Sequence, residues 1–361
     1  MKSYFFTQHS YKTQTQSSNI LQQKITMSSY NQLSLFSTIL LFLLLASILS
    51  AEKCHPDDKK TLFKIKKAFN NADMFASWTH DTDCCEWYLV SCDETTNRII
   101  SLSVNRDDEV AGHIPDTVGD LPYLEQLIFT DLPKLTGPIP QTISKLKNLK
   151  FLWLSHNNLT GSIPDFFGRL TKLTYINLSV NKLTGPIPPS VSSLHKLGAL
   201  FLERNQLKGT IPASFGGFKN NPDFYLKLAK NQLYGPLPKS LGAVNFSVLD
   251  LNRNMFTGDA SMLFGTNKGL QSIDISRNKF SFDLSKVRFP KELNVIELSH
   301  NMIYGSIPPT LAKQEHIQSF NVSYNRLCGK IPSSQELKSV DKYSYAHNKC
   351  LCGSPLPPCK K

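Results

Sequence analysis

The chain has 361 residues and a formal net charge of +12. That length allows one large domain or two small ones, and the basic surplus favours anionic partners such as an acidic polysaccharide, nucleic acid or an acidic protein. Beyond the first 51 residues no apolar run could cross a membrane, so the sequence excludes a membrane-spanning mature chain.

Residues 1–51 are predicted to be a secretory signal region. The stretch from Leu33 to Leu49 is mostly apolar, and small residues lead up to Ala51, as in a signal-peptide core and its cleavage region. The 32 residues before the apolar stretch are unusually long for a signal peptide, whereas a start at Met27 gives an ordinary length. The alternative is an uncleaved N-terminal anchor.

Eight cysteines lie in two clusters near the ends of the remaining chain. An even number behind a signal region indicates disulfides formed in an oxidising compartment. The alternative is a metal site, but neither cluster has two C-x2-C pairs at a finger-like spacing. The clusters are Cys54, Cys84, Cys85 and Cys92, and Cys328, Cys350, Cys352 and Cys359.

The cysteine clusters fall in two predicted caps, residues 52–98 and residues 333–361. In the first, Pro56–Asn70 carries apolar residues at helical spacing and acids in its first turn, which predicts a helix. Trp78 and Trp87 flank the Cys84-Cys85 pair and are expected in the core of this cap. Caps are needed because a solenoid otherwise ends in exposed apolar surface.

Between the caps, residues 99–332 repeat one pattern with a period of 23 to 26 residues. L-S-H-N-N-L-T-G-S-I-P at Leu154–Pro164 is one copy of L-x-x-L-x-L-x-x-N-x-L-x-G-x-I-P. No single copy can bury its own leucines, but stacked copies bury a continuous column. The pattern predicts an α/β solenoid, a right-handed leucine-rich-repeat superhelix with a parallel concave β-sheet. Its ten copies begin at Ile99, Leu124, Leu149, Leu173, Leu197, Asp223, Phe246, Leu270, Leu293 and Ile317.

The asparagine of the pattern is predicted to form a ladder. Its amide has both donors and acceptors, so it can satisfy the loop backbone of its own and the adjacent turn. The first two repeats lack it, and the eighth lacks the G-x-I-P tail. The ladder comprises Asn157, Asn181, Asn205, Asn231, Asn254, Asn278, Asn301 and Asn325.

Residues that flank the buried strand positions are predicted to face the concave side. One column, taken as the last strand position, reads Arg106, Asp131, His156, Val180, Arg204, Lys230, Arg253, Arg277, His300 and Tyr324. The column between the buried positions reads Ser103, Ile128, Trp153, Asn177, Phe201, Lys227, Asp250, Asp274, Glu297 and Asn321.

Two features of this surface indicate binding. Arg204, Lys230, Arg253 and Arg277 form a basic stripe of roughly 14 Å at a strand spacing of ~4.8 Å, which suits a polyanion or an acidic protein. Exposed aromatic residues indicate a protein or sugar contact. The alternatives are a solvated, locally neutralised face and scattered surface aromatics. The aromatic residues are Trp153 and Phe201, with Phe151, Tyr175 and Tyr225 one column away.

Asp250, Asp274 and Glu297 were considered as glycosidase carboxylates, which in retaining enzymes stand about 5–5.5 Å apart. A basic or imidazole residue follows each by three positions, and a nearby cation lowers a carboxylate's pKa, which is wrong for a general acid. Catalysis is therefore not expected. Four N-x-S/T sequons predict glycans at Asn158 and Asn245, which are expected in loops, and at Asn177 and Asn321 on the concave sheet.

The chain resembles the plant polygalacturonase-inhibiting proteins, extracellular leucine-rich-repeat proteins that include an antifreeze protein of carrot. The resemblance rests on Asp83-Cys-Cys-Glu-Trp87, Arg253-Asn-Met255, Gly258-Asp-Ala-Ser261, Leu263-Phe-Gly265, Phe282-Asp-Leu284, Asn321-Val-Ser323, Leu327-Cys-Gly329 and Asn348–Pro357. The segment Cys92–Leu102 looks equally like the antifreeze protein. The resemblance implies the disulfides Cys54–Cys84, Cys85–Cys92, Cys328–Cys350 and Cys352–Cys359.

The resemblance also implies a secreted cell-wall protein, not an enzyme, that binds and inhibits microbial or insect endopolygalacturonases and can associate with pectin. No cofactor, metal or nucleic acid is expected. The alternatives are ice binding and a soluble ligand or co-receptor module. The residues expected to contact the partner are Trp153, His156, Tyr175, Phe201, Arg204, Tyr225, Lys227, Lys230, Asp250, Arg253, Asp274, Arg277, Glu297 and His300.

Overall fold

The structure is a computed structural model that describes residues 53–266 and 268–360. The predicted signal region, residues 1–51, lies outside the described residues. The chain divides into two units, 1–53 and 54–361, and the account below concerns the second. None of the helices among the described residues combines the length and hydropathy that a membrane span requires.

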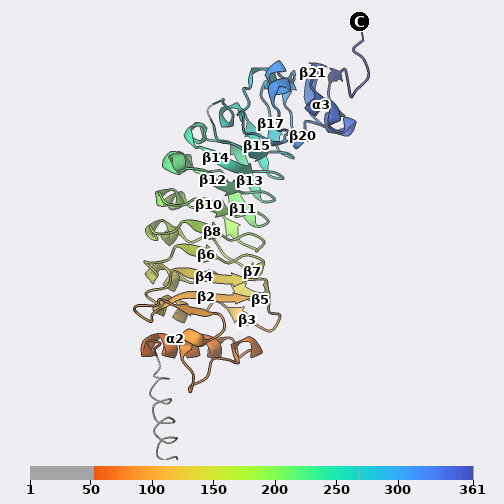
Figure 1. Ribbon diagram of the computed structural model, residues 1–361. Coiled ribbons are helices and arrows are strands. Elements are labelled where there is room, and N and C mark those ends of the chain that lie inside the picture. The colour runs from red at the N-terminus through yellow and green to blue at the C-terminus, as the bar shows by residue number, and fades with distance from the viewer. Residues whose placement is uncertain (1–52, 267, 361) are drawn as a thin grey trace, which may run out of the picture. The chain divides into compact units, whose positions relative to one another are not determined.

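One long sheet runs the length of this unit, because each repeat contributes one strand to it (Figure 1). Strand β1 pairs antiparallel with β2, and all later pairs are parallel. The eleven strands, in spatial order, are β1 (Val90–Cys92), β2 (Ile99–Asn105), β4 (Gln126–Thr130), β6 (Phe151–Trp153), β8 (Tyr175–Asn177), β10 (Ala199–Phe201), β12 (Phe224–Lys227), β14 (Phe246–Asp250), β16 (Ser272–Asp274), β18 (Val295–Glu297) and β20 (Ser319–Asn321).

After each turn the chain forms a second strand, and these strands pair into three small parallel sheets. The first sheet holds β3 (Ala111–His113), β5 (Leu132–Gly137) and β7 (Asn157–Leu159). The second holds β9 (Thr184–Gly185), β11 (Gln206–Gly209), β13 (Gln232–Pro236), β15 (Met255–Gly258) and β17 (Lys279–Phe280), and the third holds β19 (Tyr304–Gly305), β21 (Arg326–Lys330) and β22 (Cys350–Cys352).

Short 3-10 helices return the chain to the long sheet. In most repeats the proline of the G-x-I-P tail is the helix N-cap, where its fixed φ suits an extended residue that donates no hydrogen bond. In the eighth repeat Asp283 takes this place, and its carboxylate accepts a hydrogen bond from the Ser285 N–H. The helices of the repeats are η3 (Asp116–Asp120), η4 (Gln141–Lys145), η5 (Asp165–Arg169), η6 (Pro189–Ser193), η7 (Ala213–Asn220), η8 (Lys239–Ala243), η9 (Ser261–Leu263), η10 (Leu284–Lys286) and η11 (Pro309–Lys313).

The asparagine ladder forms as predicted. Asn181 accepts a hydrogen bond from the Leu159 N–H of the preceding repeat at 3.0 Å. It donates to the carbonyl oxygens of Leu154, at 2.7 Å, and of its own Leu178, at 3.1 Å. Asn348, in the C-terminal cap, makes the same set of bonds to Leu327, Val322 and Tyr345. The ladder therefore runs one step beyond the repeats, which the sequence analysis missed.

The N-terminal end is closed by helix α2 (Pro56–Ala68), by η1 (Asp73–Phe75) and η2 (Cys84–Glu86), and by β1. Leu62, Ile65 and Phe69 are buried at the helical spacing expected of them. Trp78 and Trp87 are also buried, with ring centroids 5.5 Å apart. Both tryptophans thus lie in the core of this end, as predicted.

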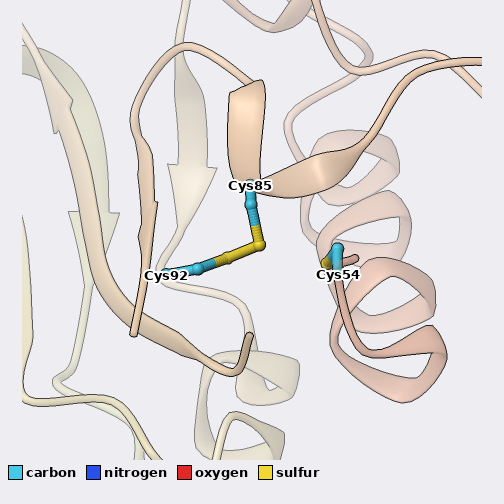
Figure 2. Close-up of side chains that lie close together, drawn as sticks. All are labelled: Cys54, Cys85 and Cys92. Atoms are coloured by element: carbon cyan, nitrogen blue, oxygen red, sulfur yellow. A yellow bond between two sulfur atoms is a disulfide. The ribbon is translucent and has the colours of Figure 1, made fainter. Parts of the chain in front are cut away.

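All cysteines of the described chain are in disulfides, which removes the metal-site alternative. Their pairs are those that the family resemblance implies: Cys54–Cys84, Cys85–Cys92, Cys328–Cys350 and Cys352–Cys359. Figure 2 shows the Cys85–Cys92 bond with Cys54 beside it. The two groups of sulfurs brace the two ends of the solenoid.

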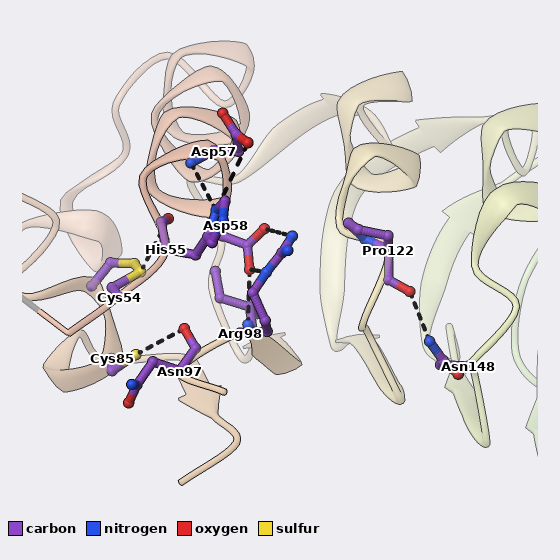
Figure 3. A network of polar contacts seen from close by, with 11 residues as sticks. Cys54, His55, Asp57, Asp58, Cys85, Asn97, Arg98, Pro122 and Asn148 are labelled. Atoms are coloured by element: carbon purple, nitrogen blue, oxygen red, sulfur yellow. Dashed lines mark hydrogen bonds and ion pairs between the residues drawn. A yellow bond between two sulfur atoms is a disulfide. The ribbon is translucent and has the colours of Figure 1, made fainter. Parts of the chain in front are cut away.

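A buried ion pair joins helix α2 to the first repeat (Figure 3). The Asp58 carboxylate, 1% exposed, accepts from Arg98 Nη2 at 2.7 Å and Nε at 2.9 Å, and from the Ile99 N–H at 3.0 Å. The Arg98 guanidinium lies 4.3 Å from the ring centroid of Tyr123. The hydrogen bonds to Asp58 raise the pKa of Arg98, so the guanidinium stays charged.

The C-terminal end is closed by backbone. Helices α3 (Gln335–Ser339) and η12 (Lys342–Tyr345) follow the last repeat. Beyond β20, the N–H groups of Val322 and Tyr324 donate to the carbonyl oxygens of Ser344 and Ala346. The short antiparallel strand β1 therefore forms one edge of the long sheet, and backbone of the C-terminal cap covers the turn that follows β20 at the other.

Candidate partner-binding face

The side of the long sheet that faces away from the core is called the sheet face here. Its central row has the register predicted from the sequence. Trp153 pairs with Asn177, Asn177 with Phe201, Phe201 with Lys227, and so on through Asp250, Asp274, Glu297 and Asn321. Side chains far apart in the chain are thus neighbours on one surface.

An aromatic cluster occupies the part of the sheet face over β6, β8 and β10. It consists of Phe151, Trp153, Tyr175 and Phe201. Tyr175 is its centre, with ring centroids 4.5 Å from Phe151, 5.9 Å from Trp153 and 5.5 Å from Phe201. Lys227 extends this surface with its Nζ 5.0 Å from the Phe201 ring centroid. The aromatic residues are therefore gathered rather than scattered.

Tyr225, 38% exposed, lies in β12 next to the aromatic cluster, and Trp153 is 36% exposed. The indole N–H of Trp153 donates to Ser155 Oγ at 2.6 Å, which holds this large ring in one orientation. A rigid, exposed indole loses little conformational freedom on binding, which suits a contact with a protein or a sugar.

The residues assigned to the last strand position are not in strands, and this prediction was wrong. They lie in the turn after each strand, directly before the ladder asparagine or, in the first two repeats, before Asp107 and Leu132, and form what is called the turn column here. All ten have φ between 53° and 56°. A left-handed residue there lets the chain leave the sheet sharply. The turn column consists of Arg106, Asp131, His156, Val180, Arg204, Lys230, Arg253, Arg277, His300 and Tyr324.

The basic stripe nevertheless stays together on this surface. Arg204, Arg253 and Arg277 are exposed and Lys230 is half-buried, in four successive turns. Backbone bonds link these turns: the N–H of Arg204 donates to Ala229 and that of Lys230 to Asn252. Four cations at one turn position of adjacent repeats repel one another, which favours an anionic group on the partner.

At either end of the basic stripe the turn column changes character. His156 Nδ1 lies 2.9 Å from Asp131 Oδ1, so this end of the turn column carries an ion pair when the imidazole is protonated. At the other end the rings of His300, Tyr324 and His347 are stacked, with centroids 4.2 and 4.1 Å apart. Burial, with the nearby Arg277 and Arg253, lowers the pKa of His300 and favours its neutral form.

The acidic residues of the central row behave differently from the expectation. Burial raises the pKa of Asp250 to about 6, and burial also raises the pKa of Glu297. For these two carboxyl groups the prediction that a nearby cation lowers the pKa is wrong, because burial has the largest effect on both. Asn252 Nδ2 bridges Asp250 Oδ1, at 2.7 Å, and Asp274 Oδ2, at 2.9 Å.

These carboxylates form a hydrogen-bonded row rather than a free acid and base. Asp250 also accepts from the Asn252 N–H, Asp274 from the Ser276 N–H, and Glu297 from Ser319 Oγ at 2.7 Å. Each carboxylate is thus oriented through at least one of its oxygens by groups of the protein itself. Together the acids place negative charge beside the basic stripe of the turn column. A complementary protein partner would therefore carry both positive and negative groups.

The sequons lie in varied surroundings. Asn158 is half-buried in β7, not in a loop as predicted, whereas Asn245 precedes β14 in a loop, with its Oδ1 accepting from the Gly269 N–H. Asn177 and Asn321 lie in the central row, as expected. Asn177 is only 8% exposed, and its Oδ1 accepts from the Ser179 N–H at 3.0 Å.

The chain matches two known family models. Residues 55–93 match the leucine-rich-repeat N-terminal domain, and residues 134–183 and 147–207 match the leucine-rich repeat. A crystal structure of a plant ice-binding protein is 49% identical and has a TM-score of 0.83, over 86% of this chain and 99% of the other.

Curated relatives cover nearly the whole chain. The polygalacturonase inhibitor of Pyrus communis is 57% identical over 90% of this chain and 99% of its own length. That of Vitis vinifera is 56% identical over 91% of this chain and 99% of its own length. With this identity along the full length of the relatives, the chain belongs to the polygalacturonase inhibitor family of leucine-rich-repeat proteins.

Proposed function

We propose that this protein binds microbial or insect endopolygalacturonases and inhibits them, and so protects cell-wall pectin. The observation that carries the proposal is the 57% identity to a polygalacturonase inhibitor over 99% of that protein's length. Inhibition here is stoichiometric binding rather than catalysis. The hydrogen-bonded acidic row, with each carboxylate oriented by the chain's own groups, is consistent with a binding surface.

The sheet face is the proposed contact surface, and the mechanism is steric: it docks beside or over the enzyme's substrate cleft. The aromatic cluster would supply buried contact area, and the basic stripe would pair with acids of the enzyme. The proposed contact residues are those named from the sequence: Trp153, His156, Tyr175, Phe201, Arg204, Tyr225, Lys227, Lys230, Asp250, Arg253, Asp274, Arg277, Glu297 and His300.

Release of reducing sugar from polygalacturonate tests the proposal. A panel of endopolygalacturonases is assayed with and without the protein, at low and at high salt. Inhibition of at least one enzyme, weaker at high salt, is the expected result, because exposed charge pairs are screened. No inhibition of any enzyme in a broad panel would sink the proposal.

A charge-reversal variant tests the basic stripe. Changing Arg204, Lys230, Arg253 and Arg277 to Glu should abolish the inhibition. The control reverses four exposed lysines that lie off the sheet face and should inhibit like the parent. These lysines are Lys196, Lys208, Lys239 and Lys279. Equal inhibition by both variants would remove the basic stripe from the mechanism.

Ice binding is the second candidate, favoured by the 49% identity to a plant ice-binding protein over 99% of that chain. An ice surface is regular and uncharged, whereas the sheet face alternates rings, carboxylates and cations. Thermal hysteresis of the purified protein, measured beside the inhibition assay, separates the two functions. Hysteresis without inhibition would replace the first proposal with the second.

We also propose that the mature protein is secreted to the cell wall, where it can associate with pectin through the basic stripe. Four disulfides are typical of proteins folded in an oxidising compartment. The proposed organisation is a signal region to residue 51, a cap over 52–98, repeats over 99–332 and a cap over 333–361. Glycans are proposed at Asn158, Asn245 and Asn321, and the burial of Asn177 disfavours one there.

A further inference from the structure

The turn column contains one residue that its conformation disfavours. Left-handed φ values are costly for β-branched residues, because the branched side chain crowds the neighbouring backbone. Val180, at φ 54°, is the only β-branched member of the turn column. The repeats on either side make the same turn with His156 and Arg204, at φ 56° each.

Neither the core nor the backbone explains this valine. Val180 is half-buried, whereas Ile176, Leu178 and Leu183 of the same repeat are fully buried and form its share of the core. Its N–H donates to Glu203 O at 2.9 Å, and its carbonyl accepts from the Asn157 N–H at 3.2 Å. Those bonds involve only main-chain atoms, so other residue types would preserve them.

The fold requires a left-handed turn here but not a valine. Residues in strained conformations cluster at functional sites. Val180 belongs to the repeat of β8, which also carries Tyr175, the centre of the aromatic cluster. Val180 thus adds a half-buried aliphatic side chain to the repeat whose neighbouring strands carry Trp153 and Phe201.

Positive charge borders this apolar area on one side. Arg204 is the next member of the turn column, and Lys227 lies against the Phe201 ring. A partner that fits has an apolar side chain for the valine and the rings, and a carboxylate within reach of Arg204. Buried apolar anchors ringed by polar contacts are the usual centres of protein interfaces.

We propose that Val180 is a specificity-determining contact with the endopolygalacturonase, seated against an apolar side chain of an acidic surface loop of that enzyme. This inference rests on the proposed function and deepens it. In that complex, Val180 determines which enzymes bind tightly, because only an enzyme with an apolar side chain opposite Val180 packs against it.

Three substitutions separate the contact from the strain. Val180→Leu keeps an apolar side chain and removes the β-branch. Val180→Thr keeps the branch and replaces one methyl group with a hydroxyl. Val180→Asn removes both the apolar character and the branch. Dissociation constants are measured for several enzymes that the parent inhibits, together with the Tm of each variant.

The dissociation constant should follow apolarity, and the Tm should follow branching. Val180→Thr and Val180→Asn should bind a sensitive enzyme about tenfold more weakly, while Val180→Leu stays within about threefold of the parent. Val180→Leu and Val180→Asn should raise the Tm by about 2 °C, and Val180→Thr should not. The loss of affinity should also differ from enzyme to enzyme.

Equal affinities for all four proteins would overturn the proposal, and so would affinities that follow the Tm rather than apolarity. A uniform loss across all enzymes would overturn the specificity role. Failure of the proposed function is detected separately, by assaying the parent protein. If the parent inhibits no enzyme, the proposed function and this contact are both rejected.

Discussion

The N-terminal cap and the repeats are held together by different kinds of contact. In the cap, the ion pair between Asp58 and Arg98 and two disulfides join unlike segments. From the third repeat onward, one asparagine amide bonds the backbone of its neighbour in the same way in turn after turn. A cap has no identical neighbour, so its contacts must be unique, whereas the repeats share theirs. A single substitution in the cap should therefore lower the free energy of unfolding more than a single substitution in the ladder.

The largest effect is expected in the cap. Asp58→Ala leaves the Arg98 guanidinium buried without its carboxylate and the Ile99 N–H unpaired, which should lower the free energy of unfolding by about 3–5 kcal/mol. Urea denaturation measures it. Asp57→Ala, at the neighbouring and largely exposed carboxylate, is the control and should change stability by less than ~1 kcal/mol. A small effect of Asp58→Ala would mean that the disulfides alone hold the cap.

An intermediate effect is expected in the ladder. Asn254→Ala removes the acceptor for the Leu233 N–H and the donor to the Leu228 and Leu251 carbonyls. Each buried unpaired group costs about 1–3 kcal/mol, so a loss of roughly 3 kcal/mol is expected in the same denaturation experiment.

The ladder prediction has a matched control in Asn148, a half-buried asparagine with solvent-exposed hydrogen bonds, which donates to the Pro122 carbonyl at 2.9 Å (Figure 3) and accepts from Lys172 Nζ at 2.7 Å. Asn148→Ala should cost less than about 1 kcal/mol, since water can replace these bonds. If both substitutions cost the same, the ladder position is not what makes the asparagine important.

The smallest effect is a stabilisation on the sheet face, and it depends on pH. Because burial raises the pKa of Asp250 to about 6 in the folded state, above the ordinary value of ~3.9, the folded protein holds this proton more tightly. Its contribution to stability is therefore complete below pH ~4 and is lost as the pH rises through about 6. Asp250→Asn should raise the free energy of unfolding at pH 7 by about 1–2 kcal/mol, and by little at pH 4.

Asp165→Asn, at an exposed aspartate, is the control for this pH effect and should change stability equally at both pH values. Stability curves from pH 4 to 7 for the parent and both variants make the comparison. A parent curve that rises over this range relative to Asp250→Asn would show that Asp250 is not held in its protonated form.

The sequence predicted the central row correctly because a repeat of fixed pattern aligns equivalent positions in register, as for Trp153, Asn177 and Phe201. The sequence did not predict the left-handed conformation of the turn column, because Arg, Lys and Val are not enriched at positive φ as Gly and Asn are. Asn348 could have been found: it follows Asn325 at the spacing of the repeat.

The raised pKa of Asp250 could not be predicted from the sequence. The position of Arg253 three residues away was visible, but the extent to which neighbouring strands exclude water from the carboxylate was not. A charge near in sequence suggested the wrong direction, because desolvation depends on which residues the fold places around the group.

The caps at the two ends of the long sheet have a consequence for how copies of this protein meet. A solenoid is built from interchangeable layers, and a bare end layer would accept the first layer of another molecule and grow into a fibre. Here β1 lies antiparallel across one end, and the main chain of Ser344 and Ala346 occupies the other. We expect the protein to stay dispersed at high concentration, with its broad sheet free for a different kind of molecule.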